Sequence, residues 1–225
     1  VLKVTIDSFK PSGFGWTANI PGFGLLADQF LEPALALWQY DTESLAPAAF
    51  GDFARIPLKP FAGTIGVAPA EPGLHSVVPP RRVGGNLDIR DLAAGTTLYL
   101  PVEVEGALLS IGDTHAAQGD GEVCVTAIET ALTGRFRLTL RKDLKLAYPR
   151  AETSDHYMTM AMDPDLDQCV VRALRDMIVL LGEKRNLSRE DAYTLCSLAA
   201  DLRVTQTVNG SKGIHCMIAK SVVHG

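Results

Sequence analysis

Apolar and polar residues alternate along several short segments of this chain. Every second residue is apolar in 2–7, 98–104 and 135–141, and glycines separate many of the segments. Because side chains two apart on a strand face the same side, these segments are predicted to be strands. In the last of them, Phe136, Leu138 and Leu140 are expected to face the interior. Several short strands between turns favour a sandwich or barrel-like core.

The spacing of apolar residues changes to three and four beyond residue 163, which predicts two helices. Asp163 is the expected N-cap of the first helix, with Pro164 at its first position and Gly182 just past its end. The second helix is expected to start at Ser188, where Asp191 completes an approximate capping box.

These elements together predict a β-rich α+β fold, with a β-sandwich or barrel-like core and two C-terminal helices. Residues 1–150 are expected to form the core that carries the functional site. Residues 151–225 are expected to form a helical part with a closing strand pair, packed on that core. The chain begins inside a predicted strand, so we expect that an N-terminal lobe is missing from it.

Composition narrows the classes of partner. Hydrophobic residues make up 47% of the 225 residues, charged residues 21%, and the net charge is −5. Lys and Arg form no basic stripe, which argues against nucleic acid as a partner. No apolar run approaches the roughly 20 residues that span a bilayer, which argues against membrane insertion. The four cysteines are widely spaced, which favours a reducing compartment and therefore the cytoplasm.

Ionisable residues are concentrated in the segment SIGDTHAAQGDGEVC, residues 110–124. If a strand reaches His115, then Asp113 and His115 point to the same side as Ile111, toward the interior. Burying an unpaired carboxylate is costly, and a divalent cation bound by both side chains would offset that cost. A hydrogen-bonded Asp–His pair without a metal explains the pattern equally well.

The residues that follow add a candidate general base. Gly119 and Gly121 allow a tight turn that would carry Glu122 back toward the side that His115 faces. A carboxylate near a metal site can serve as a general base. Gln118 is a candidate for binding a substrate amide. Asp120 has the simpler interpretation of a turn residue.

A second polar cluster lies in GGNLDIRD, residues 84–91. Asn86, Asp88 and Arg90 share one parity in this segment. Asp88 is a candidate metal ligand, and Asn86 can orient a carbonyl or an amide. The simpler alternative is a capped loop with a surface ion pair between Asp88 and Arg90.

Two further features bear on function. Aromatic residues among glycines and prolines, including Phe14, Trp16 and Phe23, can form either a core-covering loop or one wall of a small apolar pocket. Cys124 could act as a nucleophile, but no basic residue lies nearby in sequence to lower its pKa.

The chain resembles the acetamidase/formamidase family over nearly its whole length. Four stretches carry the resemblance: WTANIPGFGLLAD, GGNLDIRDL, GTTLYLPVEVEGALLSIGDTHAAQGDGEVCVTAIE and SREDAYTLCSLAADLRVTQTVNGSKGIHCMI. The resemblance implies a β-rich homo-oligomer with a divalent metal, zinc in the first place and calcium in the second. It also implies hydrolysis of formamide or acetamide to the carboxylate and ammonia. Family members carry roughly 80–100 further residues before the first strand, a domain-sized lobe. Such a lobe could be cleaved and retained as a partner fragment.

The resemblance assigns the metal region to Asp113 and His115, with Asp88 as a third ligand. Glu122, Asn86 and Gln118 are the expected catalytic residues, with Glu122 as the general base. The rival hypothesis, from another functional class, is that the chain is a non-catalytic β-sandwich binding module. In that module, Asp113, Asp120 and Glu122 would hold a structural Ca²⁺.

Overall fold

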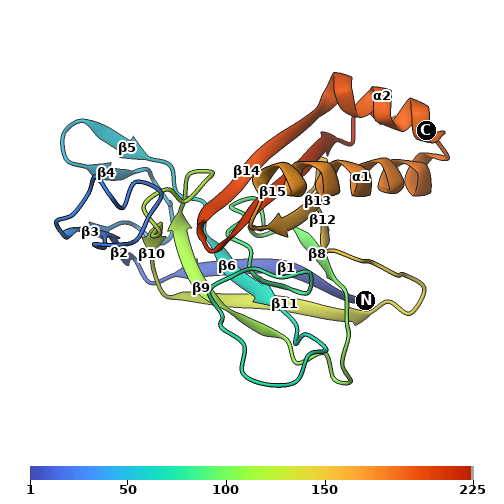
Figure 1. Ribbon diagram of the computed structural model, residues 1–225. Coiled ribbons are helices and arrows are strands. Elements are labelled where there is room, and N and C mark those ends of the chain that lie inside the picture. Colours follow the sequence, from blue (N-terminus) through green and yellow to red (C-terminus); the bar gives the residue numbers. More distant parts are fainter. Residues whose placement is uncertain (224–225) are drawn as a thin grey trace.

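The computed structural model describes residues 1–223, and within that range it contains fifteen strands and two helices (Figure 1). The strands are β1 (Leu2–Pro11), β2 (Phe14–Asn19), β3 (Ala34–Gln39), β4 (Ala48–Phe50), β5 (Ala54–Ile56), β6 (Phe61–Gly66), β7 (Gly84–Asn86), β8 (Thr97–Leu100), β9 (Ser110–Ala117), β10 (Ile128–Glu129), β11 (Leu132–Leu140), β12 (Arg150–Glu152), β13 (His156–Asp163), β14 (Ala200–Asn209) and β15 (Ser211–Ala219). The helices are α1 (Leu166–Arg185) and α2 (Arg189–Ala199).

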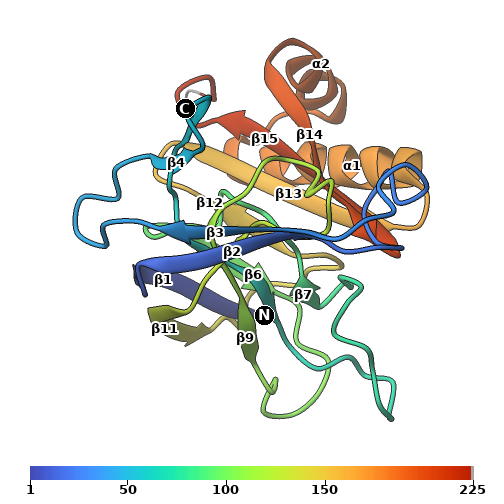
Figure 2. The same ribbon diagram turned by 90° about the vertical axis from the view of Figure 1, so that its left-hand side faces the viewer.

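Two antiparallel sheets form the body of the molecule (Figures 1 and 2). The seven-stranded sheet has the order β11-β1-β8-β12-β13-β15-β14, and the six-stranded sheet has the order β3-β2-β10-β9-β6-β7. Strands β4 and β5 form a separate small pair. Neither large sheet closes into a barrel within residues 1–223, so the core is an open sandwich. The predicted β-rich α+β class with two C-terminal helices is therefore confirmed.

Residue alternation along β13 shows why the seven-stranded sheet is covered on both faces. Met158 and Met160 belong to the core that the two sheets share, together with Ile65 of the six-stranded sheet. Tyr157 and Ala161, on the opposite face of β13, pack against the helices. Figure 1 shows α1 and α2 lying over β13–β15. A strand buried on both faces is expected to be apolar throughout, as β13 nearly is.

The seven-stranded sheet runs across residue 150, because β12 pairs with β8 on one side and with β13 on the other. The predicted division into parts 1–150 and 151–225 stays a prediction. Neither helix within residues 1–223 is long and apolar enough to cross a bilayer.

The ends of α1 differ from those predicted. The N-cap is Asp165, whose side chain accepts from the backbone N–H of Asp167, so the predicted N-cap Asp163 is wrong. Asp163 instead accepts from the backbone N–H of Asp165 and pairs with Arg172. The helix continues past Gly182 and ends at Arg185, and its C-cap Asn186 adopts a left-handed φ of 52°. Asn is the residue that best replaces glycine there.

The predicted N-cap of α2, Ser188, is confirmed, and Asp191 completes the approximate capping box through the Ser188 hydroxyl. The Ser188 hydroxyl accepts from the backbone N–H of Asp191 at 3.0 Å and donates to its carboxylate at 2.8 Å. We expect Ser188→Ala to lower the free energy of unfolding by about 1 kcal/mol, because an N-terminal N–H of the helix loses its acceptor. Urea unfolding followed by circular dichroism measures this change. Ser188→Thr, which keeps both the acceptor and the donor, should retain most of the stability.

Strand β11 corrects a prediction about which residues lie inside. Phe136 packs against the sandwich core, but Leu138 and Leu140 are 52% and 59% exposed. β11 is an edge strand of the seven-stranded sheet. Alternation predicts which residues share a face, but it does not predict whether another element covers that face.

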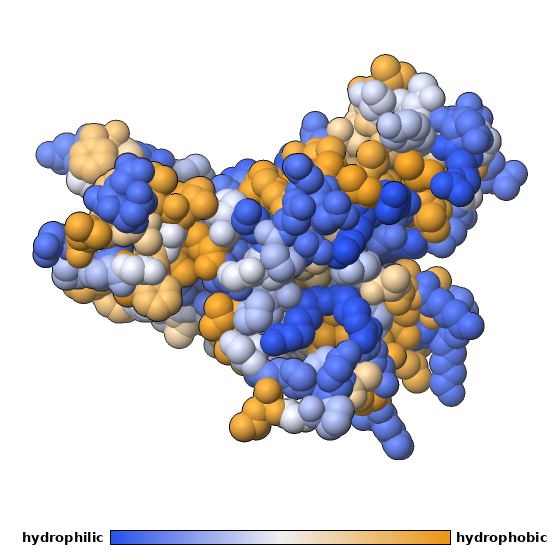
Figure 3. All heavy atoms as spheres, viewed as in Figure 1, coloured by the Kyte–Doolittle hydropathy of each residue, from blue (hydrophilic) through white to orange (hydrophobic). Residues whose placement is uncertain are grey.

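The region of β2–β5 exposes many apolar side chains, which Figure 3 shows gathered at the left of the molecule. Trp38 is buried in a small core of its own with Ile128. In contrast, Phe23, Leu35 and Phe53 are between 61% and 77% exposed. The aromatic segment is therefore only partly a core-covering element.

Candidate functional site

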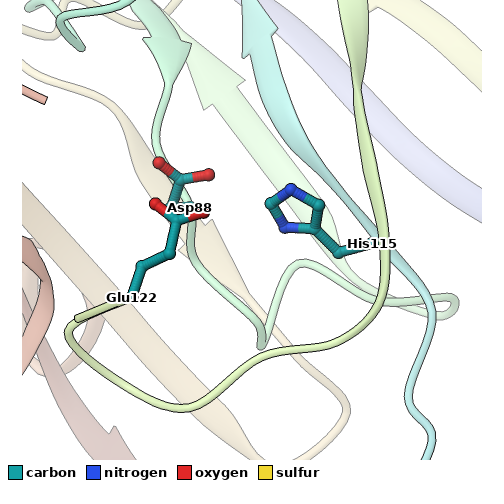
Figure 4. A group of neighbouring side chains, drawn as sticks. All are labelled: Asp88, His115 and Glu122. Carbon is teal, nitrogen blue, oxygen red and sulfur yellow. The ribbon is translucent and has the colours of Figure 1, made fainter. Parts of the chain in front are cut away.

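Three buried polar side chains converge where the six-stranded sheet meets the tip of β14 (Figure 4). His115 comes from β9, Asp88 follows β7, and Glu122 lies in the loop after β9. Their potential ligand atoms all lie within 4.8 Å of one another. Figure 4 shows the two carboxylates side by side, with the imidazole facing them. The turn at Gly119–Gly121 thus brings Glu122 back toward His115, as its glycines suggested.

A second group shares His115 and adds two more carboxylates. The His115 Nε2 atom lies 3.3 Å from Asp113 Oδ1 and 3.2 Å from Glu129 Oε2. The ligand atoms of this group also lie within 4.8 Å of one another. Four carboxylates therefore surround one imidazole, which is an arrangement that needs a compensating positive charge.

Left-handed backbone at three of these residues directs their side chains. Asp88, Asp113 and Glu122 have φ values of 52°, 50° and 45°. This conformation costs roughly 1–2 kcal/mol for a non-glycine residue and is concentrated at functional sites.

Asp113 interrupts the ladder between β9 and β6 without shifting its register. The pairing with β6 skips Asp113, since Ala62 pairs with Thr114 and Thr64 with Gly112. Alternation predicted that Asp113, Ile111 and His115 all point inward. Asp113 and His115 do meet, but only His115 is buried. Ile111 is 36% exposed, and the side chain of Asp113 is 37% exposed. His115 is fully buried.

Gln118 determines which nitrogen of His115 carries a proton. Its Nε2 donates to the backbone carbonyl of Asp88 at 2.8 Å, and a carbonyl can only accept. Its Oε1, 3.0 Å from His115 Nδ1, is therefore an acceptor, so Nδ1 carries a hydrogen. The His115 Nε2 atom, between two carboxylates, is left to hold either a proton or a cation.

The electrostatics of the group reflect this crowding. Burial raises the pKa of Glu122 to about 9, and the nearby carboxylate of Asp88 adds to the rise. Burial likewise raises the pKa of Asp88 to about 7, opposed by the charge of His115. Burial lowers the pKa of His115, but Asp113 and Glu129 outweigh it and hold that pKa well above its usual value.

The donor set fits a divalent cation. Asp88 is 1% exposed, and its Oδ1 atom has no hydrogen-bond partner within residues 1–223. A Cβ added at Gly63 would lie 2.6 Å from that atom and 3.0 Å from Asp113 Oδ2, so only glycine leaves room for both oxygens. Carboxylate oxygens with one imidazole suit zinc or calcium.

A cavity of about 880 Å³ opens beside these groups. Asp113, Glu122, Glu129 and Asn86 contribute its polar wall. Its apolar wall includes Trp16, Ile20, Phe23, Val78, Pro79 and Val125. Part of the aromatic segment is thus a pocket wall, which was one of its two predicted roles. Phe14 lines a separate hollow.

The remaining predicted residues lie as follows. Asn86 accepts from the Thr64 hydroxyl at 2.9 Å and donates to the carbonyl of Val78 at 3.1 Å. The alternative of a surface pair between Asp88 and Arg90 is wrong, since Arg90 pairs with Asp120 at 3.0 Å.

Cys124 is half-buried, and its thiol lies close to the carbonyl and hydroxyl of Thr126. These partners supply no positive charge that would favour a thiolate.

Sequence reasoning missed three residues of the site. Glu129 is a lone acid at the end of the two-residue strand β10, between Ile128 and Thr130, and this context gave only a weak signal. Gly63 gave no signal. Asn209, which donates to Asp88 Oδ2 at 2.8 Å, precedes Gly210 in a typical turn pair, so its sequence context indicated only a turn.

Comparisons with known proteins agree with this architecture. A sequence profile described as the Acetamidase/Formamidase family matches residues 72–219. An acetamidase from Mycolicibacterium smegmatis is 56% identical over 46 residues, which are 20% of this chain and 11% of that protein. A formamidase from Methylophilus methylotrophus is 48% identical over 67 residues, which are 29% of this chain and 16% of that protein.

A crystal structure of an acetamidase from Bacillus halodurans superposes with a TM-score of 0.90 at 36% identity. The superposition covers 97% of this chain and 72% of that one, whereas the alignments with the two sequence relatives reach less than two thirds of their length. The profile match spans most of the chain and takes in Asp88, His115 and Glu122. This chain therefore belongs to the acetamidase/formamidase family.

Proposed function

We propose that this chain carries the active site of a metal-dependent amidohydrolase acting on formamide or acetamide. The oxygen of a water molecule forms a bond to the amide carbonyl carbon, and the carbon–nitrogen bond then breaks. The products are the carboxylate and ammonia. The observation that carries the proposal is the set of carboxylates around His115 at the edge of a partly apolar cavity.

Asp88, Asp113 and His115 are the proposed ligands of a divalent cation. Their oxygen and nitrogen atoms suit zinc first and calcium second. When bound, such a cation polarises a carbonyl group and makes water more acidic. The hydrogen on Nδ1 of His115, which Gln118 accepts, leaves Nε2 free for this role. Gln118 therefore orients His115 in our proposal, in addition to its predicted role near the substrate.

Glu122 is the proposed general base. It accepts a proton from the attacking water and returns that proton to the leaving nitrogen. Burial raises the pKa of this carboxyl to about 9 in the metal-free site. A bound cation would favour the ionised form, which is the form that can accept the proton. Asn86 faces the same cavity and is the proposed contact for the substrate amide. Trp16 and Phe23 would border the acyl group.

Two wider properties accompany this proposal. The exposed apolar side chains of β2–β5 support a homo-oligomer, because large apolar patches commonly mark interfaces. The four unpaired thiols support a reducing compartment such as the cytoplasm.

Ammonia release from formamide and acetamide tests the proposal. We expect turnover that a chelator abolishes and that added Zn²⁺ restores. If Ca²⁺ stabilises the protein against heat while neither amide is hydrolysed, the non-catalytic calcium module is favoured instead. Full activity of Cys124→Ala would exclude a cysteine nucleophile.

Gly63→Ala should weaken the site without unfolding the sandwich. The new Cβ would lie 2.6 Å from Asp88 Oδ1 and 2.8 Å from the backbone oxygen of Asp113, so at least one carboxylate must move. We expect Zn²⁺ affinity to fall at least 10-fold, as measured by competition with a chromophoric chelator. Gly112→Ala is the matched control, because a Cβ there meets no atom within 4 Å. Equal affinity in the two variants would contradict the prediction.

A further inference from the structure

The hairpin of β14 and β15 reaches the site from the far end of the sequence. Asn209, the last residue of β14, is 5% exposed and lies on the wall of the cavity. Its Nδ2 donates to Asp88 Oδ2 at 2.8 Å, across 121 positions of sequence. An ionised carboxylate accepts only, so the nitrogen end of the Asn209 amide must face it.

This hydrogen bond leaves the two oxygens of Asp88 in different states. Oδ2 is held by Asn209, whereas Oδ1 is buried without a hydrogen-bond partner in residues 1–223 and faces Gly63. Rotation about the last side-chain bond would exchange the two oxygens. Because Asn209 holds one of them, the other keeps a fixed direction and stays available as a ligand atom.

Gln206 holds Asn209 itself in place. Gln206 is fully buried, and its Oε1 accepts from the backbone N–H groups of Val208 at 3.1 Å and Asn209 at 3.2 Å. Its Nε2 donates to the carbonyl of Ser211 on the other side of the turn. An interior amide therefore satisfies the backbone of this irregular turn. These hydrogen bonds thereby fix the position of Asn209.

The same strand also holds the loop of Glu122. The backbone N–H of Gly121 donates to the carbonyl of Thr205 at 3.0 Å. The Gly121 carbonyl accepts from both the backbone N–H and the hydroxyl of Thr207, at 3.1 and 3.0 Å. Strand β14 thus positions the residue before Glu122 as well as the carboxylate of Asp88.

We infer that Asn209 is a positioning residue, which orients Asp88 so that its Oδ1 atom can bind a divalent cation. This inference rests on the proposed function only in requiring that the site binds such a cation. Groups that hydrogen-bond to metal ligands typically contribute 10- to 100-fold to metal affinity. Asn209 makes no contact with the reacting atoms in this role.

Zn²⁺ titration of the full chain against a chromophoric chelator tests the inference. Asn209→Ala removes the donor, and Asn209→Leu removes it while keeping similar volume. We expect the Kd for Zn²⁺ to rise about 10- to 100-fold in both variants. Ser211→Ala is the matched control, because it changes the same turn without touching the bond to Asp88. It should keep the wild-type Kd.

Two further measurements separate this role from a merely structural one. Circular dichroism of the metal-free variants should match that of the wild type. With Co²⁺ in place of Zn²⁺, the visible absorption bands of the variants should shift, because the ligand orientation has changed. If one of the two Asn209 variants fails to fold, the other is compared with the wild type. If neither folds, Asn209 is a structural residue and the inference is overturned.

The remaining outcomes distinguish the two proposals. If the wild type binds Zn²⁺ and both Asn209 variants bind it equally well, the positioning role is wrong and the proposed function stands. If the wild type binds neither Zn²⁺ nor Co²⁺, the metal component of the proposed function fails, and the inference fails with it.

Discussion

Glu122→Gln should lower kcat for amide hydrolysis by about 10²- to 10⁴-fold, the usual contribution of a general base. Glutamine keeps nearly the same shape in the buried position, which is 6% exposed, but it cannot accept the proton of the attacking water. The measurement is steady-state ammonia release at saturating Zn²⁺. KM for acetamide should change little, because the substrate amide does not depend on this proton for binding.

Metal binding separates the two roles that are open to Glu122. A general base that is not a ligand should leave the Kd for Zn²⁺ nearly unchanged in Glu122→Gln. A large rise in Kd would make Glu122 a ligand and would move the base to another carboxylate, such as Glu129. Glu105→Gln, at an exposed position, serves as the surface control and should keep wild-type kcat. If Glu122→Gln also keeps it, Glu122 is not the base.

Asp88→Asn should make the metal-free protein more stable at alkaline pH while it destroys metal binding. The folded-state pKa of Asp88 is raised from 3.8 to about 7, so ionisation opposes folding. That penalty is absent below about pH 4, grows as pH rises through 7, and is constant above. At 1.36 kcal/mol for each pKa unit, the full effect is on the order of 4 kcal/mol. Asparagine does not titrate and avoids it.

Urea unfolding in the presence of a chelator, at pH 4.5 and at pH 8.5, measures this effect. The variant and the wild type should have similar stability at the lower pH and diverge at the higher one. Adding Zn²⁺ should then stabilise only the wild type. Asp52→Asn, on the exposed surface, should change neither value. A variant less stable than the metal-free wild type at pH 8.5 would contradict the prediction.

The sequence predicted those parts of the site that depend on local spacing. Asp113 and His115 are two residues apart, and the glycines around Asp120 allowed the return of Glu122. Local spacing is enough for such groups, because a strand and a tight turn fix their geometry over a few residues.

Other parts of the site depend on contacts that spacing does not contain. Asn209 meets Asp88 only because β14 ends beside the six-stranded sheet, and Glu129 meets His115 only through strand pairing. Asp113 has a left-handed φ of 50° within β9, which strand alternation does not anticipate. Similarly, Asp163 and Asp165 are both good N-caps in sequence, but Asp163 pairs with Arg172 and Asp165 caps the helix.

The bond between Asp88 and Asn209 also has a kinetic consequence. It joins two segments that are synthesised far apart, and it can form only after β14 has been added at the outer edge of its sheet. Contacts between residues far apart in sequence form late in folding, because the intervening chain must first lose conformational entropy. A refolding experiment with Zn²⁺ present should therefore show ion uptake as its slowest phase, which makes the ion a reporter of completed assembly.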